Sequence, residues 1–293
     1  MRKLFKNPGR KALLVPYLDL REKGLEIGAS INPTFPKSEN YPVKILDHAP
    51  REELRLKYGS ELADRIEEVD YIWTGEPYQD LVQGEKFAWI LAAHVLEHVP
   101  DLIGFINDCA SILKENGVLA LVVPDKRFCF DYFRPQAALS AVIEANASQS
   151  KHPGIGSYVE YHAYFAEKCG KPVWEPGCTR EPGFTAKLDP SILKDYEKGK
   201  YNDVHVWAFT PASCRLVLED LNRLELIKLR EQAFIPTVGH EFYLILSFTG
   251  NGPDISRTQL ARKALAECAQ KVFVNKAPRQ LLRSIYFWLR EKF

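Results

Sequence analysis

The feature that most constrains the fold is a series of short apolar runs, separated by turn residues, between residues 24 and 125. Runs of roughly four to eight residues that are nearly continuous in Val, Ile, Leu and Ala suit strands buried on both faces of a parallel sheet. The runs are GLEIGAS, VKILDHA, VDYIWTG, KFAWILAAH and VLALVVPD, which begin at residues 24, 43, 69, 86 and 118.

Helical patterns lie between several of these runs. Residues 51–66 form one, and residues 101–114 form another, with an Asp at its start, one apolar face, and Asn116 and Gly117 as its stop. Strand, helix and strand with short joints make a βαβ unit, and its repetition gives a doubly wound sheet. The sequence therefore predicts an α/β fold.

The pattern lapses after Asp125, in a stretch rich in Pro, Gly, Tyr and His. So long a loop is expected to fold as a cap, which we place at residues 126–207. Order returns where Thr210 can cap a helix that has Pro211 in its first turn. Residues 224–234 and 240–248 then suit an antiparallel closing pair. We expect one domain over residues 1–255, including the cap, followed by a basic helical extension over 256–293.

Composition and charge narrow the class of protein. No apolar stretch approaches the ~20 residues that span a bilayer, and the N-terminus lacks a signal-peptide pattern, so we expect a cytoplasmic protein. Six cysteines without a C-x-x-C pair predict reduced thiols and no thiolate zinc site. The net charge of +1 divides into +5 at residues 1–11, +7 at residues 257–293 and −11 between them, and an acidic body argues against a nucleic-acid partner.

The stretch AAHVLEHVPD, residues 92–101, admits two interpretations. His94, Glu97 and His98 spell H-x-x-E-H, the inverted metalloprotease signature, in which two histidines on one helix hold zinc. That helix should extend for several turns, whereas His94 directly follows a buried-strand run and Pro100 comes too soon for a long helix. The context therefore favours a bend from strand to helix beside a cofactor, and we expect no metal site.

Several motifs occur in one order along the chain: GLEIGAS, Asp47 at the close of the next run, AAHVLEHVPD, and LKENGVLALVVPD. This order resembles the class I S-adenosylmethionine-dependent methyltransferases, in particular the type 11 group, with its HVLEHVPD-like signature followed by L-K-x-x-G-x-L. The resemblance covers residues 23–125 and, more loosely, residues 203–248. It implies a seven-stranded, mostly parallel Rossmann-like sheet, S-adenosylmethionine as cofactor, and methyl transfer as the activity.

The cofactor site is expected at the carboxyl ends of the strands, where open α/β sheets bind ligands. Gly28 leaves room for close backbone approach, and Asp47 is placed to accept hydrogen bonds from the ribose hydroxyls. By resemblance, Glu26 either binds the amino group of the methionine part through water or organises the loop. The expected cofactor residues are Glu26, Gly28, Ala29, Ser30, Asp47, His48, Thr74, Ala92, Ala93 and His94.

Two departures from the family pattern motivate a rival hypothesis. The loop after the first run has a single glycine, Gly28, where the family has G-x-G-x-G, and Thr74 replaces the acidic residue common after strand three. A methyltransferase-like protein that no longer binds cofactor would serve as a scaffold in a biosynthetic complex. A zinc metalloprotease is a remote third alternative.

The acceptor is expected to be a small molecule or a glycan, most simply a sugar hydroxyl. In NDVHVWAF an extended backbone places Asp203, His205 and Trp207 on one face, so that Asp203 can orient His205 as general base. His162 and Asp125 are the rival bases. The resemblance, with VPDKR followed by aromatic residues, also implies an association with the glycosyltransferases of surface polysaccharide synthesis.

The C-terminal sequence NKAPRQLLRSIYFWLREKF combines an apolar stripe with flanking basic residues. A basic amphipathic helix with aromatic residues can lie on an anionic membrane surface, here the inner face of the membrane. It can equally pack on the acidic body or across a dimer, and the sequence leaves these alternatives open.

Overall fold

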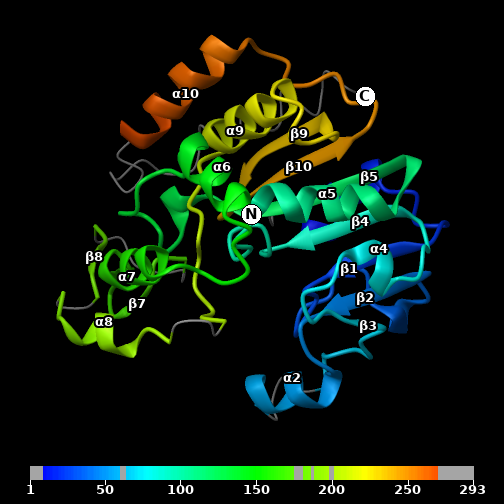
Figure 1. Cartoon of the computed structure of the whole chain (residues 1–293), viewed down its shortest axis with the longest axis horizontal. Coiled ribbons are helices and arrows are strands. Elements are labelled where there is room, and N and C mark those ends of the chain that lie inside the picture. Colours follow the sequence, from blue (N-terminus) through cyan, green and yellow to red (C-terminus); the bar gives the residue numbers. More distant parts are fainter. Residues whose placement is uncertain (1–8, 60–63, 175–180, 186–187, 198–200, 270–293) are drawn as a thin grey trace, which may run out of the picture.

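A seven-stranded sheet forms the centre of the computed structural model, which describes residues 9–59, 64–174, 181–185, 188–197 and 201–269 (Figure 1). The strand order is β3-β2-β1-β4-β5-β10-β9. Its strands are β1 (Gly24–Ile27), β2 (Val43–Asp47), β3 (Tyr71–Ile72), β4 (Phe87–Ala93), β5 (Leu113–Pro124), β9 (Arg230–Val238) and β10 (Glu241–Ser247).

The first five strands of this sheet are parallel, and β10 lies antiparallel between β5 and β9. This arrangement confirms the predicted doubly wound, mostly parallel sheet of the Rossmann-like kind. The closing antiparallel pair is also present, although its first strand begins at Arg230 and not at residue 224.

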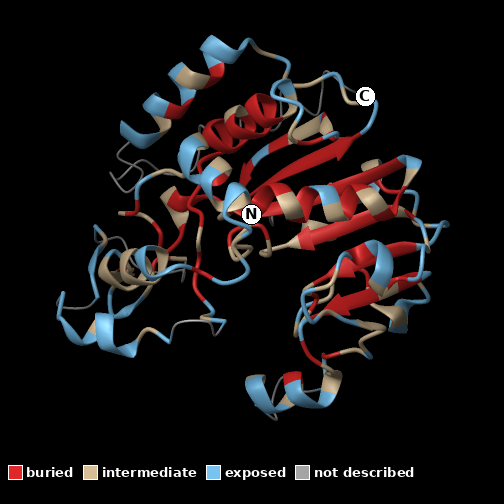
Figure 2. Cartoon of the chain, in the orientation of Figure 1, coloured by how far each residue is buried: buried red, intermediate tan, exposed pale blue. Residues whose placement is uncertain are grey.

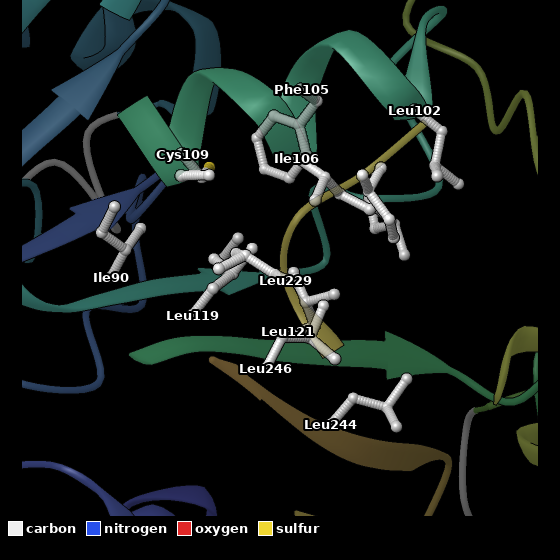
Figure 3. Close-up of a cluster of buried hydrophobic side chains, with 14 of the residues drawn as sticks. Ile90, Leu102, Phe105, Ile106, Cys109, Leu119, Leu121, Leu229, Leu244 and Leu246 are labelled. Carbon is white, nitrogen blue, oxygen red and sulfur yellow. The ribbon is translucent and has the colours of Figure 1, made fainter. Parts of the chain in front are cut away.

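Both faces of the sheet are covered, so its strands are buried, which explains why they read as continuous apolar runs (Figure 2). On one face α5 (Leu102–Ile112) and α9 (Pro211–Arg223) pack against alternate strand residues such as Leu119, Leu121 and Leu244 (Figure 3). On the other face Leu14 and Phe35 pack against Trp89 and its neighbours.

The end of α5 differs from the prediction. Asp101 caps its start, with the carboxylate accepting from the Gly104 N–H at 2.9 Å, as expected. The helix ends at Ile112, however, and β5 begins at Leu113, so Asn116 and Gly117 lie in the strand and do not stop the helix. The pairing of β4 with β5 is irregular here, and a Cβ on Gly117 would lie only 3.0 Å from the Phe87 carbonyl oxygen.

The inserted segment 126–207 begins close to the sheet and then forms a lobe of its own (Figure 1). Its first α-helix, α6 (Leu139–Ala147), packs beside α5 through Val142. The remaining elements are η3 (Lys126–Phe128), α7 (Ile155–Ala163), α8 (Ser191–Asp195) and a small sheet of β6 (Ala166–Lys168), β7 (Lys171–Pro172) and β8 (Gly183–Phe184).

One cysteine corrects the expectation that all six thiols are reduced. Cys169, in the turn between β6 and β7, is disulfide-bonded. The other four described cysteines, Cys109, Cys129, Cys214 and Cys268, are free. The even scatter of cysteines along the sequence gave no sign of this bond.

The remaining elements lie near the two ends of the described chain and around the sheet. They are α1 (Arg10–Leu14), η1 (Val15–Tyr17), η2 (Lys37–Glu39), α2 (Arg51–Tyr58), α4 (Tyr78–Leu81) and α10 (Arg257–Ala269). The last of them packs on α9, with Leu260 and Ala264 against Ala212. Residues 270–293, which carry most of the predicted basic extension, lie outside the described residues. Among the helices that are described, none has the length and apolar character to cross a bilayer.

Gly24 allows β1 and β4 to approach, and its replacement tests this packing. A Cβ at Gly24 would lie 1.9 Å from the indole of Trp89, which is fully buried. We expect Gly24→Ala to lower the free energy of unfolding by about 1–3 kcal/mol, measured by urea denaturation. Gly156→Ala is the control, because a Cβ at Gly156 meets nothing within 4 Å and α7 tolerates alanine. Equal stability of Gly24→Ala and the wild type would contradict this account.

Candidate active site

The carboxyl ends of β1, β2 and β4 lie side by side and bring Gly28, Asp47 and His94 to one edge of the sheet. Gly28 has φ +64°, and its N–H donates to the Leu46 carbonyl at 2.9 Å. A Cβ there would lie 2.8 Å from the Val95 side chain, so glycine permits both the backbone conformation and the close contact.

Asp47 is buried at this edge and offers one free acceptor. Its Oδ1 accepts from the His48 N–H at 2.8 Å and lies 2.7 Å from His48 Nδ1. Its Oδ2 is buried and has no hydrogen-bond partner among the described residues. A buried carboxylate oxygen without a partner is costly, so this atom is suited to a hydroxyl donor from a ligand.

The stretch His94–Val99 forms a turn and not a helix, because α5 starts only at Leu102. His94 has φ +55°, and its N–H donates to the Val122 carbonyl on β5 at 2.9 Å. Its Nε2 lies 2.7 Å from Glu241 Oε1. This conformation rules out the H-x-x-E-H metalloprotease arrangement, which needs both histidines on one helix.

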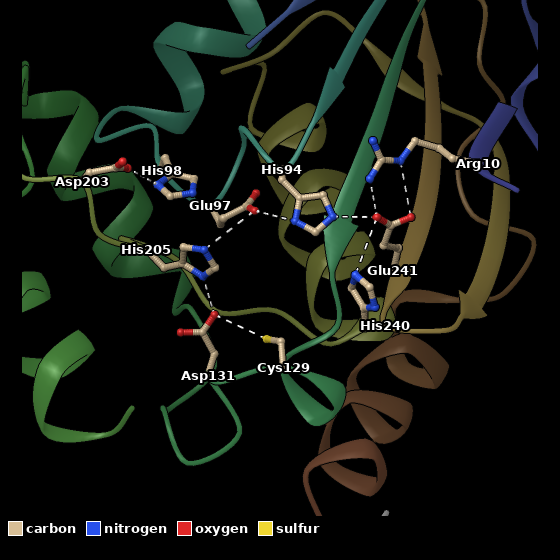
Figure 4. A network of polar contacts seen from close by, with 10 residues as sticks. All are labelled: Arg10, His94, Glu97, His98, Cys129, Asp131, Asp203, His205, His240 and Glu241. Carbon is tan, nitrogen blue, oxygen red and sulfur yellow. Dashed lines mark hydrogen bonds and ion pairs between the residues drawn. The ribbon is translucent and has the colours of Figure 1, made fainter. Parts of the chain in front are cut away.

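The side chain of Glu97, which belongs to this turn, lies at the centre of a polar cluster with His94 and His205 (Figure 4). The side chain is 1% exposed, and neither carboxylate oxygen has a hydrogen-bond partner among the described residues. The nearest ring nitrogens are His94 Nδ1 at 3.5 Å and His205 Nε2 at 4.0 Å from Oε1. Its carbonyl oxygen accepts from the Val206 and Trp207 N–H groups at 2.6 and 3.1 Å, which joins the end of the insertion to the turn.

His205 is oriented by Asp131, a residue that the sequence did not single out. The His205 Nδ1 lies 2.5 Å from Asp131 Oδ2, and the other oxygen of Asp131 accepts from Arg134 at 2.9 Å. Burial alone would raise the pKa of Asp131, but the adjacent His205 and Arg134 outweigh it and lower that pKa to about 2. Asp131 is therefore ionised and holds the imidazole with Nε2 directed toward Glu97.

The predicted pairing of Asp203 with His205 is wrong. Asp203 instead lies 3.2 Å from His98 Nδ1 and accepts from Lys57 Nζ at 3.0 Å. The adjacent His98 imidazole is the main reason that the pKa of Asp203 falls well below its usual range. The extended backbone places Asp203 and His205 on one face, but Asp203 pairs with Lys57 of α2 and His98 of the turn instead of with His205.

The other two predicted bases have different surroundings. Asp125 is fully buried; its Oδ1 accepts from the Arg127 N–H at 3.1 Å, and its Oδ2 accepts from the Thr237 hydroxyl at 2.6 Å. His162 lies on α7, where its ring contacts those of Tyr158 and Tyr161, and burial lowers its pKa. Among the described residues, the side chain of neither one forms a hydrogen bond or ion pair with Glu97 or Asp131.

Comparison with known protein families identifies the family to which this chain belongs. Residues 8–166, more than half of the chain, match the family described as "Methyltransferase domain". The chain belongs to this methyltransferase family. Its cofactor is S-adenosylmethionine. No curated protein matches the sequence.

Solved structures give similarity of a weaker kind. The PH0226 protein from Pyrococcus horikoshii OT3 has 13% identity and a TM-score of 0.44, with 81% of this chain and 86% of that chain covered. A SAM-dependent methyltransferase from Aquifex aeolicus has 11% identity and a TM-score of 0.39, covering 81% and 88%. The mitomycin 7-O-methyltransferase MmcR has 15% identity and a TM-score of 0.38; the match covers 81% of this chain but only about half, 52%, of MmcR.

The sequence predicts that Asp47 accepts hydrogen bonds from the ribose of S-adenosylmethionine, and its free Oδ2 is available for that contact. Ser30, with φ 45°, also has a buried hydroxyl oxygen with no partner among the described residues. The loop after β1, with its single glycine Gly28, therefore offers a second free polar group for a ligand. Ala29 is buried, and its carbonyl closes the loop by accepting from the Asn32 N–H at 3.0 Å.

Glu26 organises this loop, which is one of the two roles expected of it. Its carboxylate accepts from the N–H groups of Thr34 and Phe35 at 2.7 and 3.2 Å. Burial raises the pKa of Glu26, and these two backbone hydrogen bonds oppose that rise. The buried carboxylate of Glu26 thus fixes this loop of the methyltransferase through two backbone hydrogen bonds.

The remaining predicted cofactor residues contribute less through their side chains. Thr74 is exposed, and its N–H and hydroxyl both donate to Glu76, at 3.0 and 2.7 Å. Ala92 is fully buried in the apolar core, and Ala93 is partly buried. His48 is half exposed, beside Asp47.

Tyr201 is a further residue that the sequence did not identify. Its side chain is half exposed, but partial desolvation of the hydroxyl, and then the charges of Asp203, Glu97 and Asp47, raise its pKa above the usual range. The last part of the segment therefore lies near both Asp47 and the polar cluster. No motif in the sequence distinguishes this tyrosine from the other aromatic residues of the segment.

Asp47→Asn tests the cofactor site. We expect it to weaken the binding of S-adenosylhomocysteine about tenfold to a hundredfold, because hydrogen bonds to charged groups contribute roughly 1.5–3 kcal/mol. Isothermal titration calorimetry measures this affinity. Asp19→Asn, at an exposed carboxylate paired with Arg21, is the control and should leave it unchanged. An unaltered affinity in Asp47→Asn would place the ribose elsewhere.

Proposed function

We propose that this methyltransferase transfers the methyl group of S-adenosylmethionine to a hydroxyl group of a sugar or glycan. The observation that carries the proposal is the polar cluster of Glu97, His205 and Asp131, next to the sheet edge that carries Asp47 and His94. Methyl transfer is an in-line displacement, so the enzyme must chiefly align the acceptor and exclude water.

A hydroxyl acceptor explains why such a cluster lies beside the cofactor edge. An alcohol must lose its proton as it attacks the methyl group, and an oriented imidazole assists that loss. Asp131 holds Nδ1 of His205, which leaves Nε2 for the acceptor side. Asp125 is less suited to this role, because both of its oxygens already accept hydrogen bonds.

Aromatic rings around the cluster support a sugar as the acceptor. The ring centroid of Phe130 lies 4.7 Å from that of His205 and 4.5 Å from that of Trp174. The ring centroids of Trp174 and His94 are 6.2 Å apart. Apolar ring faces beside carboxylates and imidazoles suit a molecule with both C–H faces and hydroxyl groups. The setting that we propose is surface polysaccharide synthesis in the cytoplasm, which the sequence resemblance implies.

A second candidate is a scaffold protein of the same fold without catalytic activity. The feature that favours it is the loop with a single glycine, Gly28, followed by Ala29 and Ser30. Titration with S-adenosylmethionine separates the two candidates, because a scaffold should not bind it even at millimolar concentration, whereas the enzyme should bind it stoichiometrically.

His205→Ala tests the proposed role of the cluster. We expect turnover to fall by about a hundredfold or more, the usual contribution of a group that assists proton transfer, with cofactor affinity unchanged. The measurement is formation of S-adenosylhomocysteine with a panel of nucleotide sugars and short glycans. His162→Ala is the comparison and should retain most activity. Normal turnover in His205→Ala, or loss only in His162→Ala, would move the chemistry to the rival base.

A further inference from the structure

The carboxylate of Glu97 is buried, and none of the described residues donates a hydrogen bond to it. It is 1% exposed, both oxygens lack hydrogen-bond partners among the described residues, and the closest ring nitrogens are 3.5 and 4.0 Å away. A buried charge of this kind is strongly unfavourable unless a cation or several donors face it. The neighbouring carboxylates of Asp131 and Glu241 are paired with Arg134 and Arg10, whereas no arginine among the described residues pairs with Glu97.

Besides His94, two histidines, His98 and His205, lie close to Glu97, and each has a carboxylate near its Nδ1. Asp131 lies 2.5 Å from Nδ1 of His205, and Asp203 lies 3.2 Å from Nδ1 of His98. The two rings stand edge to face, with centroids 4.6 Å apart, and their other nitrogens are left for the space shared with Glu97 (Figure 4). A carboxylate behind each imidazole is the usual outer partner of a histidine that binds a metal ion.

We propose that Glu97, His98 and His205 bind one divalent transition-metal ion. One ligand atom from each residue lies within 4.8 Å of the others, so small shifts of these side chains would bring all three to metal–ligand distances of about 2.0–2.2 Å from one ion. Two imidazole nitrogens and one carboxylate oxygen suit Zn²⁺ or a similar first-row ion, whereas Mg²⁺ and Ca²⁺ prefer oxygen ligands. Three ligands from the chain leave coordination positions open.

A second group with suitable atoms, His94, His240 and Glu241, does not fit an ion as well. Glu241 already binds the Arg10 guanidinium, the Tyr243 hydroxyl and His94 Nε2. A divalent cation there would face a fixed positive charge on the same carboxylate. The three residues of the H-x-x-E-H motif therefore have different partners. Glu97 and His98 belong to the proposed metal site, while His94 forms a hydrogen bond with Glu241.

The ion gives His205 a more specific role, and this part of the inference rests on the proposed function. With the ion bound, Nε2 of His205 is a ligand, so the ion takes over from the free imidazole the task of assisting proton loss from the acceptor. An ion with open positions can bind the acceptor oxygen and favour loss of its proton. Binding of the ion itself depends only on the geometry of the three ligands.

The test is metal binding by the full chain without an affinity tag, first stripped with a chelator. Titration with Co²⁺, followed by its visible absorption, and elemental analysis after loading with Zn²⁺ should both give one ion per chain. We expect Glu97→Gln and His98→Ala each to weaken binding by at least about tenfold, since loss of outer partners alone costs about 10–100-fold. His240→Ala, in the second group, is the matched control and should bind as the wild type does.

Calorimetry with S-adenosylhomocysteine on the same samples shows that each variant is folded and keeps the two proposals separate. Retained nucleoside binding without stoichiometric Co²⁺ at micromolar free metal overturns the metal site alone. Metal affinity that falls in His240→Ala but not in Glu97→Gln overturns it as well. Stoichiometric metal without nucleoside binding supports the metal site and overturns the proposed methyl transfer.

Discussion

The site depends on one turn, His94–Val99, whose backbone is bonded to two distant parts of the chain. The His94 N–H donates to β5, the Glu97 carbonyl accepts from Val206 and Trp207, and the Trp207 indole donates to the Val99 carbonyl at 2.8 Å. These bonds fix the end of the insertion against the carboxyl edge of the sheet. Without them, His205 would not reach Glu97, and the cofactor edge and the polar cluster would be separate features.

Charge is distributed unevenly within that cluster. Burial would raise the pKa of Asp131 and of Glu241, but in each case an adjacent histidine and arginine outweigh it, hold the pKa below its usual range and keep the carboxylate ionised. Glu97, between them, has only imidazoles nearby. Buried polar groups without partners are rare in folded proteins and tend to lie at functional sites. The free oxygens of Glu97 and Asp47 are therefore the two places where we propose that ligands bind.

The sequence predicted what depends on local pattern and missed what depends on side chains meeting across the fold. Apolar runs and turn residues were sufficient for the parallel sheet, the Asp101 cap and the closing antiparallel pair, since burial on two faces imposes that pattern. The bend at His94 followed from Pro100 and the preceding strand. Asp131 was not predicted as the partner of His205, because 74 residues separate them and Asp203 is nearer in sequence. The disulfide at Cys169 also left no local signal.

The central claim is that the reacting sulfur of the cofactor faces the cluster around Glu97. A crystal structure of the complex with S-adenosylhomocysteine tests it most directly. The account predicts density with a ribose hydroxyl on Asp47 Oδ2 and the sulfur on the side of His94, directed toward Glu97 and His205. A nucleoside bound away from Asp47, or with its adenine and not its sulfur beside the cluster, would contradict it.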